Sequence, residues 1–377
     1  MVAMSVDRLF GVAVAIVAAC AFQHGEQGTG DAPTAGSDGM GATGSDAGSN
    51  CFGTGLVKVC LSQQPTTPLH ITADTDLDTG SASACQPLTS ASQTGLCVIA
   101  ATTVQVDASH TLFAHGSMPL VIVATQMIQI DGKIDVASHI GAQIGAGAGP
   151  TACTPGAAPS MCGGGGGGGF GTPGGPGGGA DTGGCNGATG GSAGQAIAAS
   201  SLLGGCAGTT GGVNKNGTGG GVGGAGGGAV YLISQTAIDV SSNGVIDASG
   251  AGGGGAVHYN NGGGGGGGGG AGGMIGLDAP MITIEGQVFA NGGGGGTGAD
   301  YSNDSQAGSD PTSASSAAAG GSGYGTIEAF GGAGAYETTA AGSGVTNYSG
   351  GGGGGGVGIV VTFGTLSLEG GVVSPSP

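Results

Sequence analysis

The sequence has few aromatic side chains and no tryptophan. Its 377 residues include 8 phenylalanines and 6 tyrosines, whereas 99 residues are glycine. Aromatic residues supply much of the buried area of compact domains, and glycine brings no side chain to a core. We therefore expect a thin core that is distributed along the chain, and fewer compact domains than the length alone would suggest.

Basic residues are also scarce. The chain has 4 Lys and Arg residues against 22 Asp and Glu residues, which gives a net charge of −18. Apart from Arg8 near the N-terminus, the basic residues are Lys58, Lys133 and Lys215. A protein that neutralises phosphates needs many lysines or arginines, so this composition excludes nucleic acid as a partner and electrostatic docking on anionic lipid.

A long hydrophobic run is missing as well. The run from Leu9 to Ala19 follows Arg8 and would extend about 16 Å as a helix, too short for a bilayer core of about 30 Å. A basic residue, a short apolar run and a small-residue ending are typical of a secretory signal peptide. The sequence therefore predicts a signal peptide over residues 1–19 and an exported protein.

The end of this segment resembles the lipobox of bacterial lipoproteins. Val17, Ala18 and Ala19 precede Cys20, and the resemblance implies that the Cys20 thiol is diacylglycerated and becomes the mature N-terminus. Two acyl chains on one residue suffice for stable anchoring. We therefore expect a lipid anchor in the cell envelope, at the outer membrane or the cell surface. Ordinary signal cleavage near Ala19 is the alternative.

Cysteine parity agrees with lipidation. The chain has nine cysteines. If Cys20 carries a lipid, the other cysteines are even in number, which in an exported chain predicts disulfides. Pairing of sequence neighbours is the simplest arrangement. The predicted disulfides are Cys51 with Cys60, Cys85 with Cys97, Cys153 with Cys162, and Cys185 with Cys206.

The chain divides by composition. Residues 20–50 are mainly Gly, Ala, Ser, Thr and Asp with almost nothing to bury, which is typical of a flexible linker. Residues 51–109 contain short apolar runs between Pro, Ser and Gly, which favour a small disulfide-stapled β module. Residues 110–377 contain glycine-rich repeats.

Four segments share one pattern of three short strands. They are PLVIVATQMIQIDGKIDVAS from Pro119, AVYLISQTAIDVSSNGVIDASG from Ala229, GMIGLDAPMITIEGQVFANG from Gly273, and GIVVTFGTLSLEGGVVSPS from Gly358. The middle strand of each alternates apolar and polar residues, as at Ile238 and Val240, which places one face inside. Such a unit cannot bury its apolar face alone. We therefore predict an all-β fold, a parallel β-helix-like solenoid with long glycine-rich insertions; a β-sandwich is the alternative.

The insertions hold glycine runs at 163–169, 262–270, 292–296 and 350–356. Ordering glycine costs more entropy than ordering any other residue, so we expect flexible loops. Close packing of polyproline-II-like helices is the alternative, because no Cβ would separate them.

The opening CFGTGLVKVCLSQQPTTPLHI, the later DTDLDTGSASAC, the segment PLVIVATQMIQIDGKIDVAS, and the recurring GGGAVYLIS and GGMIGLDAP resemble a family of uncharacterised glycine-rich exported proteins of myxobacteria. The resemblance spans most of residues 51–373. It implies no activity and no functional residues.

Asp74, Asp76 and Asp78 place carboxylates at alternating positions, a spacing by which loops wrap calcium. An EF-hand loop would need glycine where Thr79 stands and glutamate where Cys85 stands. A solvated acidic loop is therefore the favoured interpretation, with calcium as the alternative and no other cofactor expected.

The sequence offers no GxSxG elbow and no histidine pair at metal-ligand spacing. Acidic residues in the repeats could serve glycoside hydrolysis, but those followed by glycine, such as Asp131 and Glu285, are typical of turns. These acids are Asp131, Asp135, Asp239, Asp247, Asp278 and Glu285. We therefore expect no enzyme, and a structural or adhesive cell-surface scaffold. A carbohydrate-binding or carbohydrate-cleaving protein and an ice or mineral binder are the alternatives.

Overall fold

The computed structural model describes residues 50–377 except 82, 89–92, 182–184, 260–261, 301–302 and 324–328. The signal peptide expected over 1–19, the lipidation site Cys20 and the linker up to residue 49 lie outside the described residues. Of two compact units, Met1–Ala47 and Gly48–Pro377, the second contains all of the described residues.

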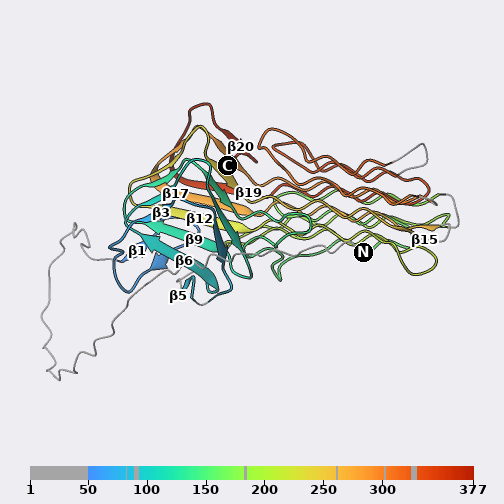
Figure 1. Cartoon of the computed structure of the whole chain (residues 1–377), viewed down its shortest axis with the longest axis horizontal. Helices are drawn as coiled ribbons and strands as arrows, with labels where there is room; N and C mark the ends of the chain where they lie inside the picture. The colour runs from blue at the N-terminus through green and yellow to red at the C-terminus, as the bar shows by residue number, and fades with distance from the viewer. Residues whose placement is uncertain are drawn as a thin grey trace, which may run out of the picture. The chain divides into compact units, whose positions relative to one another are not determined.

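The described residues form strands and extended segments, with no helix among them (Figure 1). The strands are β1 (Cys51–Phe52), β2 (Val59–Cys60), β3 (Leu69–Ile71), β4 (Thr75–Asp78), β5 (Gln86–Leu88), β6 (Leu96–Ala101), β7 (Val104–Val106), β8 (Thr111–His115), β9 (Leu120–Ala124), β10 (Ile128–Ile130), β11 (Lys133–Asp135), β12 (Ala229–Ser234), β13 (Ala237–Val240), β14 (Val245–Asp247), β15 (His258–Tyr259), β16 (Gly262–Gly263), β17 (Met274–Ile284), β18 (Gln287–Phe289), β19 (Ile359–Leu368) and β20 (Val372–Ser374).

The four sequence repeats pair with one another strand by strand. In the ten-stranded sheet, Ile128 of β10 is in register with Ile238 of β13, which is in register with Ile282 of β17. The last repeat continues the series, since Ile282 pairs with Leu366 of β19. This parallel register confirms the predicted correspondence between repeats and places apolar side chains on one another in a continuous core.

The third strands of the repeats form a separate six-stranded sheet. Its order is β20, β18, β14, β11, β8 and β4, and all of its pairs are parallel. Residues 51–109, expected as a separate small module, contribute β3 and β5–β7 to the ten-stranded sheet and β4 to this one. The sheets are therefore continuous across the boundary expected at residue 109.

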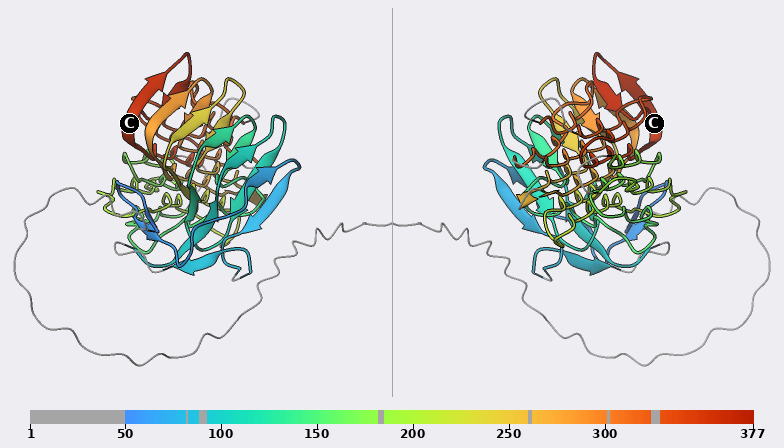
Figure 2. Two further views of the ribbon diagram at one scale, coloured as in Figure 1. Left: turned by 90° about the vertical axis from the view of Figure 1, so that its left-hand side faces the viewer. Right: turned by 90° about the vertical axis from the view of Figure 1, so that its right-hand side faces the viewer.

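The predicted β-helix solenoid is wrong. The parallel sheets form a nearly closed barrel, and Figure 2 shows its strands in an arc from the N-terminal strands (blue) to the C-terminal ones (red). Strand twist is the physical reason, because twisted parallel strands curl around their apolar side chains. The β-sandwich alternative fails as well, since it requires mainly antiparallel strands and the two large sheets are parallel except for the pair β5–β6.

The barrel interior is aliphatic. Its cluster contains fully buried Ile130, Ile134 and Leu232 among about thirty Ile, Leu, Val, Ala and Cys residues. A second cluster lies on the outside of β6, β9 and β12 and includes Tyr231 of β12. Phe52 from the β1–β2 hairpin and Phe170 from the glycine-rich region belong to the same cluster and cover the sheet. The core is thus mainly aliphatic, as expected from the few aromatic residues, and is concentrated in two clusters.

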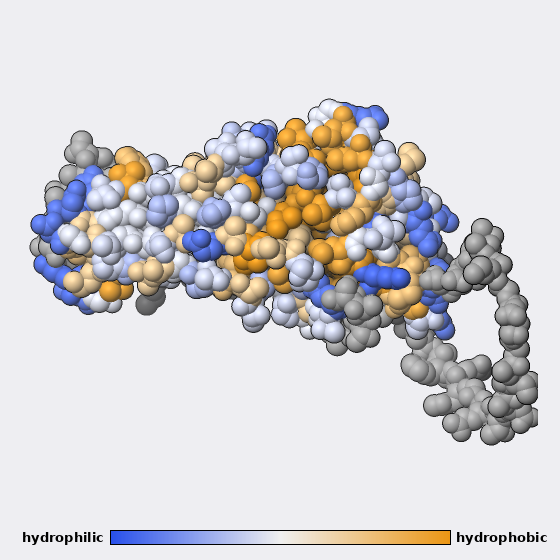
Figure 3. Space-filling model, turned by 180° about the vertical axis from the view of Figure 1, so that it is seen from behind, coloured by the Kyte–Doolittle hydropathy of each residue, from blue (hydrophilic) through white to orange (hydrophobic). Residues whose placement is uncertain are grey.

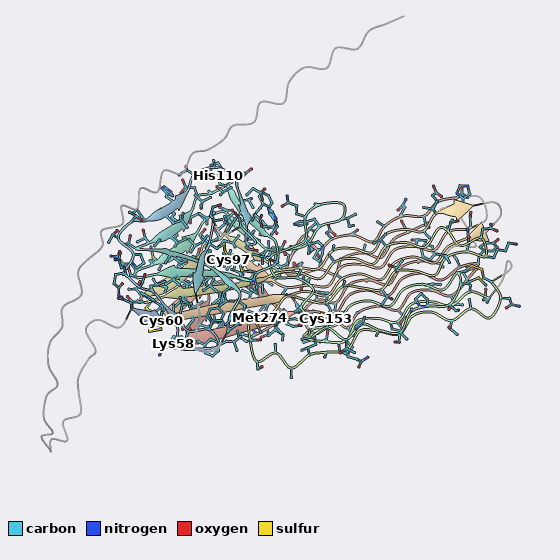
Figure 4. The ribbon with its side chains drawn as sticks, turned by 90° about the horizontal axis from the view of Figure 1, so that it is seen from below. Lys58, Cys60, Cys97, His110, Cys153 and Met274 are labelled. Atoms are coloured by element: carbon cyan, nitrogen blue, oxygen red, sulfur yellow. A yellow bond between two sulfur atoms is a disulfide. The ribbon has the colours of Figure 1, made fainter. Side chains whose placement is uncertain are left out.

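The glycine-rich region is ordered, contrary to the expectation of flexible loops. We name it the glycine bundle: the described residues of 146–228, 248–273 and 290–358. Its segments run side by side (Figure 4). Every amide from Gly265 to Gly273 donates to a carbonyl of a neighbouring segment. The partner segment changes with a period of three residues, which is the period of a polyproline II helix.

Segment 263–273 lies at the centre of this bundle. It exchanges backbone hydrogen bonds with six neighbouring segments: 163–171, 205–213, 219–228, 248–258, 290–298 and 349–358. A Cβ atom on Gly266, Gly267 or Gly268 would meet the carbonyl oxygen of Gly296, Val222 or Gly166, respectively. Three successive residues thus face three different neighbours, and the inner segment must be glycine at almost every position.

Two of the four predicted disulfides are confirmed, Cys51 with Cys60 and Cys85 with Cys97. The other two pairings are wrong. Cys153 is bonded to Cys206, and Cys162 is bonded to Cys185. Because bundle segments that are distant in sequence lie side by side, the nearest cysteine in the chain is not the nearest one in space.

Candidate functional site

A row of side chains crosses the outer face of the six-stranded sheet. Register places Asp76 of β4 beside Phe113 of β8, and Phe113 beside Asp135 of β11. The row continues through Asp247 of β14 to Phe289 of β18. Phe113 is 41% exposed, whereas Asp135 is 4% and Asp247 is 1% exposed. The row therefore begins at the surface and ends buried.

The buried part of this row is an ion cluster. The Lys133 Nζ lies 2.7 Å from Asp135 Oδ2 and 3.0 Å from Asp247 Oδ2. His139 Nε2 lies 3.3 Å from Asp135 Oδ2, and His139 Nδ1 lies 3.5 Å from Asp310 Oδ2. Lys133 thus joins the third strands of two adjacent repeats, and His139 connects that pair to the glycine bundle through Asp310.

Backbone amides also donate hydrogen bonds to these carboxylates. Ala137 N donates to Asp135 Oδ1 at 3.0 Å, and Ser249 N donates to Asp247 Oδ1 at 3.0 Å. Asp310 accepts from Ile140 N at 3.0 Å and from Gly252 N at 2.8 Å. Buried carboxylates are tolerated because they are paired and hydrogen-bonded in this way.

The environment shifts the pKa of each group. Hydrogen bonds to Asp135 and then Asp310 raise the pKa of His139 to about 10, so its imidazole is a cation at neutral pH. Burial opposes the charge of Lys133, but the attraction of Asp247 and Asp135 outweighs it and raises the pKa of the amine. The cluster therefore contains two cations.

The two carboxylates around Lys133 respond differently. Burial raises the pKa of Asp247 despite the neighbouring amine. Burial also opposes ionisation of Asp135, but the hydrogen bond to His139 and the charge of Lys133 outweigh burial and lower its pKa. The second cation, His139, explains the difference.

A hollow of about 370 Å³ opens beside this cluster. Its walls include Asp76, Phe113, His115, Asp135 and His139. The His115 Nε2 lies 3.1 Å from Asp76 Oδ1. Carboxylate and imidazole groups therefore stand on both sides of an exposed aromatic ring, an arrangement that can donate and accept hydrogen bonds.

A second hollow, of about 420 Å³, lies between the β1–β2 hairpin, the end of β12 and the middle of β17 and β19. Its acid, Asp278, is fully engaged in holding the loop that follows β1. The carboxylate accepts from Thr54 N at 2.7 Å, Thr54 Oγ1 at 2.7 Å, Gly55 N at 2.8 Å and Tyr231 Oη at 3.2 Å. Asp278 therefore has a structural role.

The candidate calcium ligands do not converge. Asp74 accepts from Thr111 N at 2.9 Å, Asp76 faces His115, and Asp78 accepts from Gly80 N at 2.8 Å. Among the described residues, no group of three His, Cys, Asp or Glu side chains is placed to hold a metal ion. Asp76 instead belongs to the row that borders the hollow beside Phe113.

Two of the other acids lie in turns, as expected from the glycine that follows each of them. Asp131 and Glu285 stand at the bends between β10 and β11 and between β17 and β18. Asp135 and Asp247 differ, because they end strands and are buried. Sequence reasoning missed Phe113, Lys133, His139 and Asp310 as members of one site; the signal was the spacing of Lys133, Asp135 and His139 in KIDVASH.

No helix among the described residues has the length and apolar character needed to cross a membrane. No protein family, curated protein or solved structure matches this chain.

Proposed function

We propose that this chain is a non-catalytic cell-surface scaffold, structural or adhesive, exported and held at the envelope by a lipid on Cys20. Its partners are the membrane, through that lipid, and cell-surface polymers or glycans. The glycine bundle is the observation that carries the proposal. Because side chains do not fit at the inner positions of the bundle, only its outer segments and connecting turns can contact a partner.

The surface composition supports this function. On the face shown in Figure 3, weakly polar and small residues cover much of the bundle, while strongly hydrophobic residues gather near the barrel. Outer bundle segments expose single side chains at a spacing of three, as at Ala207, Thr210 and Val213. A regular, neutral surface of this kind suits extended contact with a polymer.

The buried acids argue against hydrolysis. Asp247 is 1% exposed and is held by Lys133 and the amide of Ser249. A substrate would have to displace both partners before this carboxylate could act as an acid or base. Four disulfides also suit an oxidising compartment outside the cytosol.

The test compares two substitutions in a strain that displays the protein. Gly268→Ala adds one methyl group where the Gly166 carbonyl oxygen stands, whereas Ala207→Val adds two at an exposed position. Adhesion of the cells to one another or to matrix should fall with Gly268→Ala and persist with Ala207→Val. If a variant whose bundle amides exchange freely with solvent hydrogen still adhered fully, the scaffold function would be refuted.

A further inference from the structure

The exposed end of the acidic row has the geometry of a ligand site. Asp76 and Asp135 flank Phe113, each one strand away in register. Adjacent strands are about 4.8 Å apart, so the two carboxylate-bearing residues stand on either side of the phenyl ring. The ring itself is 41% exposed. The result is an apolar platform with the exposed Asp76 on one side and the buried, already hydrogen-bonded Asp135 on the other.

The hollow over this platform is of suitable size. Its volume of about 370 Å³ lies in the range of small-molecule pockets, roughly 300 to 1,000 Å³. Ala114 and Ala137 are small wall residues, which leaves the ring accessible. Asp135 is held at the wall by the Ala137 amide, Lys133 and His139, so this wall of the hollow is rigid before any ligand arrives.

The polar groups of the hollow suit hydroxyl groups. Lys133 and His139 hold the buried Asp135, which leaves Asp76, 3.1 Å from the His115 imidazole, as the exposed carboxylate of the hollow. A carboxylate and an imidazole side by side match hydroxyl groups, since each hydroxyl both donates and accepts.

We propose that this hollow binds one ring of a neutral saccharide, with the apolar face of the sugar on Phe113 and its hydroxyl groups hydrogen-bonded to Asp76 and His115. The site deepens the proposed function by giving the glycan partner a binding pocket, and it rests on that function; glycoside binding is measured separately from adhesion, so either can fail alone.

The experiment is titration calorimetry of the protein from residue 50 onward and of the full chain with four methyl glycosides. The probes are the methyl glycosides of glucose, galactose, mannose and N-acetylglucosamine, and spermidine and galacturonate are titrated as cationic and anionic comparisons. At least one should bind the wild type, and Phe113→Ala should weaken that binding by about tenfold or more. Phe113→Tyr, which keeps the ring, should retain it, and Asp76→Asn should weaken it.

Met127→Ala is the matched control, because Met127 is also an exposed apolar residue, 39% exposed, in the turn between β9 and β10. It should bind as the wild type does. Thermal unfolding of each variant separates loss of the site from loss of the fold. The proposal is overturned if none of the four glycosides binds, if Phe113→Ala binds as tightly as the wild type, or if only spermidine or galacturonate binds.

Discussion

Asp278 and Thr54, 224 residues apart in sequence, are joined by two hydrogen bonds of 2.7 Å, from the backbone amide and the hydroxyl of Thr54 to one carboxylate. The same carboxylate accepts from Tyr231. Burial and the nearby Asp278 charge raise the pKa of the Tyr231 phenol, so it remains a donor. This contact fixes the first loop of the second unit against the barrel.

Replacing Asp278 by alanine should lower the free energy of unfolding by about 2 to 4 kcal/mol, because several buried donors lose their acceptor at once. Urea denaturation measures the effect. Glu285→Ala is the control, since Glu285 is exposed at a bend, and it should change stability by less than about 0.5 kcal/mol. Equal effects of the two substitutions would mean that Asp278 does not hold the loop.

The ion cluster predicts an alkaline loss of stability. The folded-state pKa of His139 is about 10, above its unfolded value of 6.5. Its contribution is therefore complete below about pH 6.5 and is lost as pH rises toward 10. Unfolding free energies measured from pH 6 to pH 10 should decline in the wild type, and the decline should be smaller in His139→Gln.

His110→Gln serves as the comparison for this pH series, because His110 lies at the surface, 3.9 Å from Asp74. The unfolding free energy of His110→Gln should depend on pH as that of the wild type does. Parallel profiles for the wild type and His139→Gln would show that His139 does not stabilise the fold through Asp135 and Asp310.

The disulfide framework has a direct chemical test. Non-reducing peptide mapping should recover Cys153 linked to Cys206 and Cys162 linked to Cys185, beside the two pairs closer in sequence. Serine at both Cys162 and Cys185 should destabilise the protein by about 2 to 4 kcal/mol. Recovery of Cys153 linked to Cys162 would contradict the arrangement of the bundle segments.

Lipidation of Cys20 remains a prediction from the sequence. Cys20→Ser should abolish incorporation of labelled fatty acid and release the protein from the membrane fraction. Cys51→Ser is the control, since that thiol is bonded to Cys60 and should have no effect on fatty-acid labelling. Unchanged membrane association of Cys20→Ser, without label, would show that another element anchors the chain.

The strand repeats were predictable because side-chain alternation reports burial directly. Ile238 and Ile282 belong to the middle strands of the repeats that begin at Ala229 and Gly273, and they stand in register in the sheet. The closure of the barrel was not predictable, since it depends on the twist accumulated over the sheets and not on any one strand.

The packing of the glycine bundle could not be predicted from the sequence, for a different reason. Gly268 donates to Thr209 and Gly269 donates to Gly353, yet nothing in a run of identical glycines distinguishes these two positions. Partner choice is set by the register of distant segments. For the same reason the pairing of Cys162 with Cys185 was missed, and so was Asp310, which reaches His139 from an outer segment.

The order of the bundle changes the expected effect of a deletion. If residues 252–272 were a flexible insertion, their deletion would leave the flanking strands folded at little cost. In the structure they contain most of the central segment of the bundle, hydrogen-bonded on all sides, and their removal should unfold the bundle.

Amide hydrogen exchange at Gly265–Gly273 in the native protein tests the central claim most directly. All nine amides donate to carbonyls of neighbouring segments, so they should be protected to a degree comparable with β9 and β12 of the barrel. Exchange of these amides at the rate of an unstructured glycine peptide, with β9 and β12 still protected, would contradict an ordered glycine bundle and the scaffold function built on it.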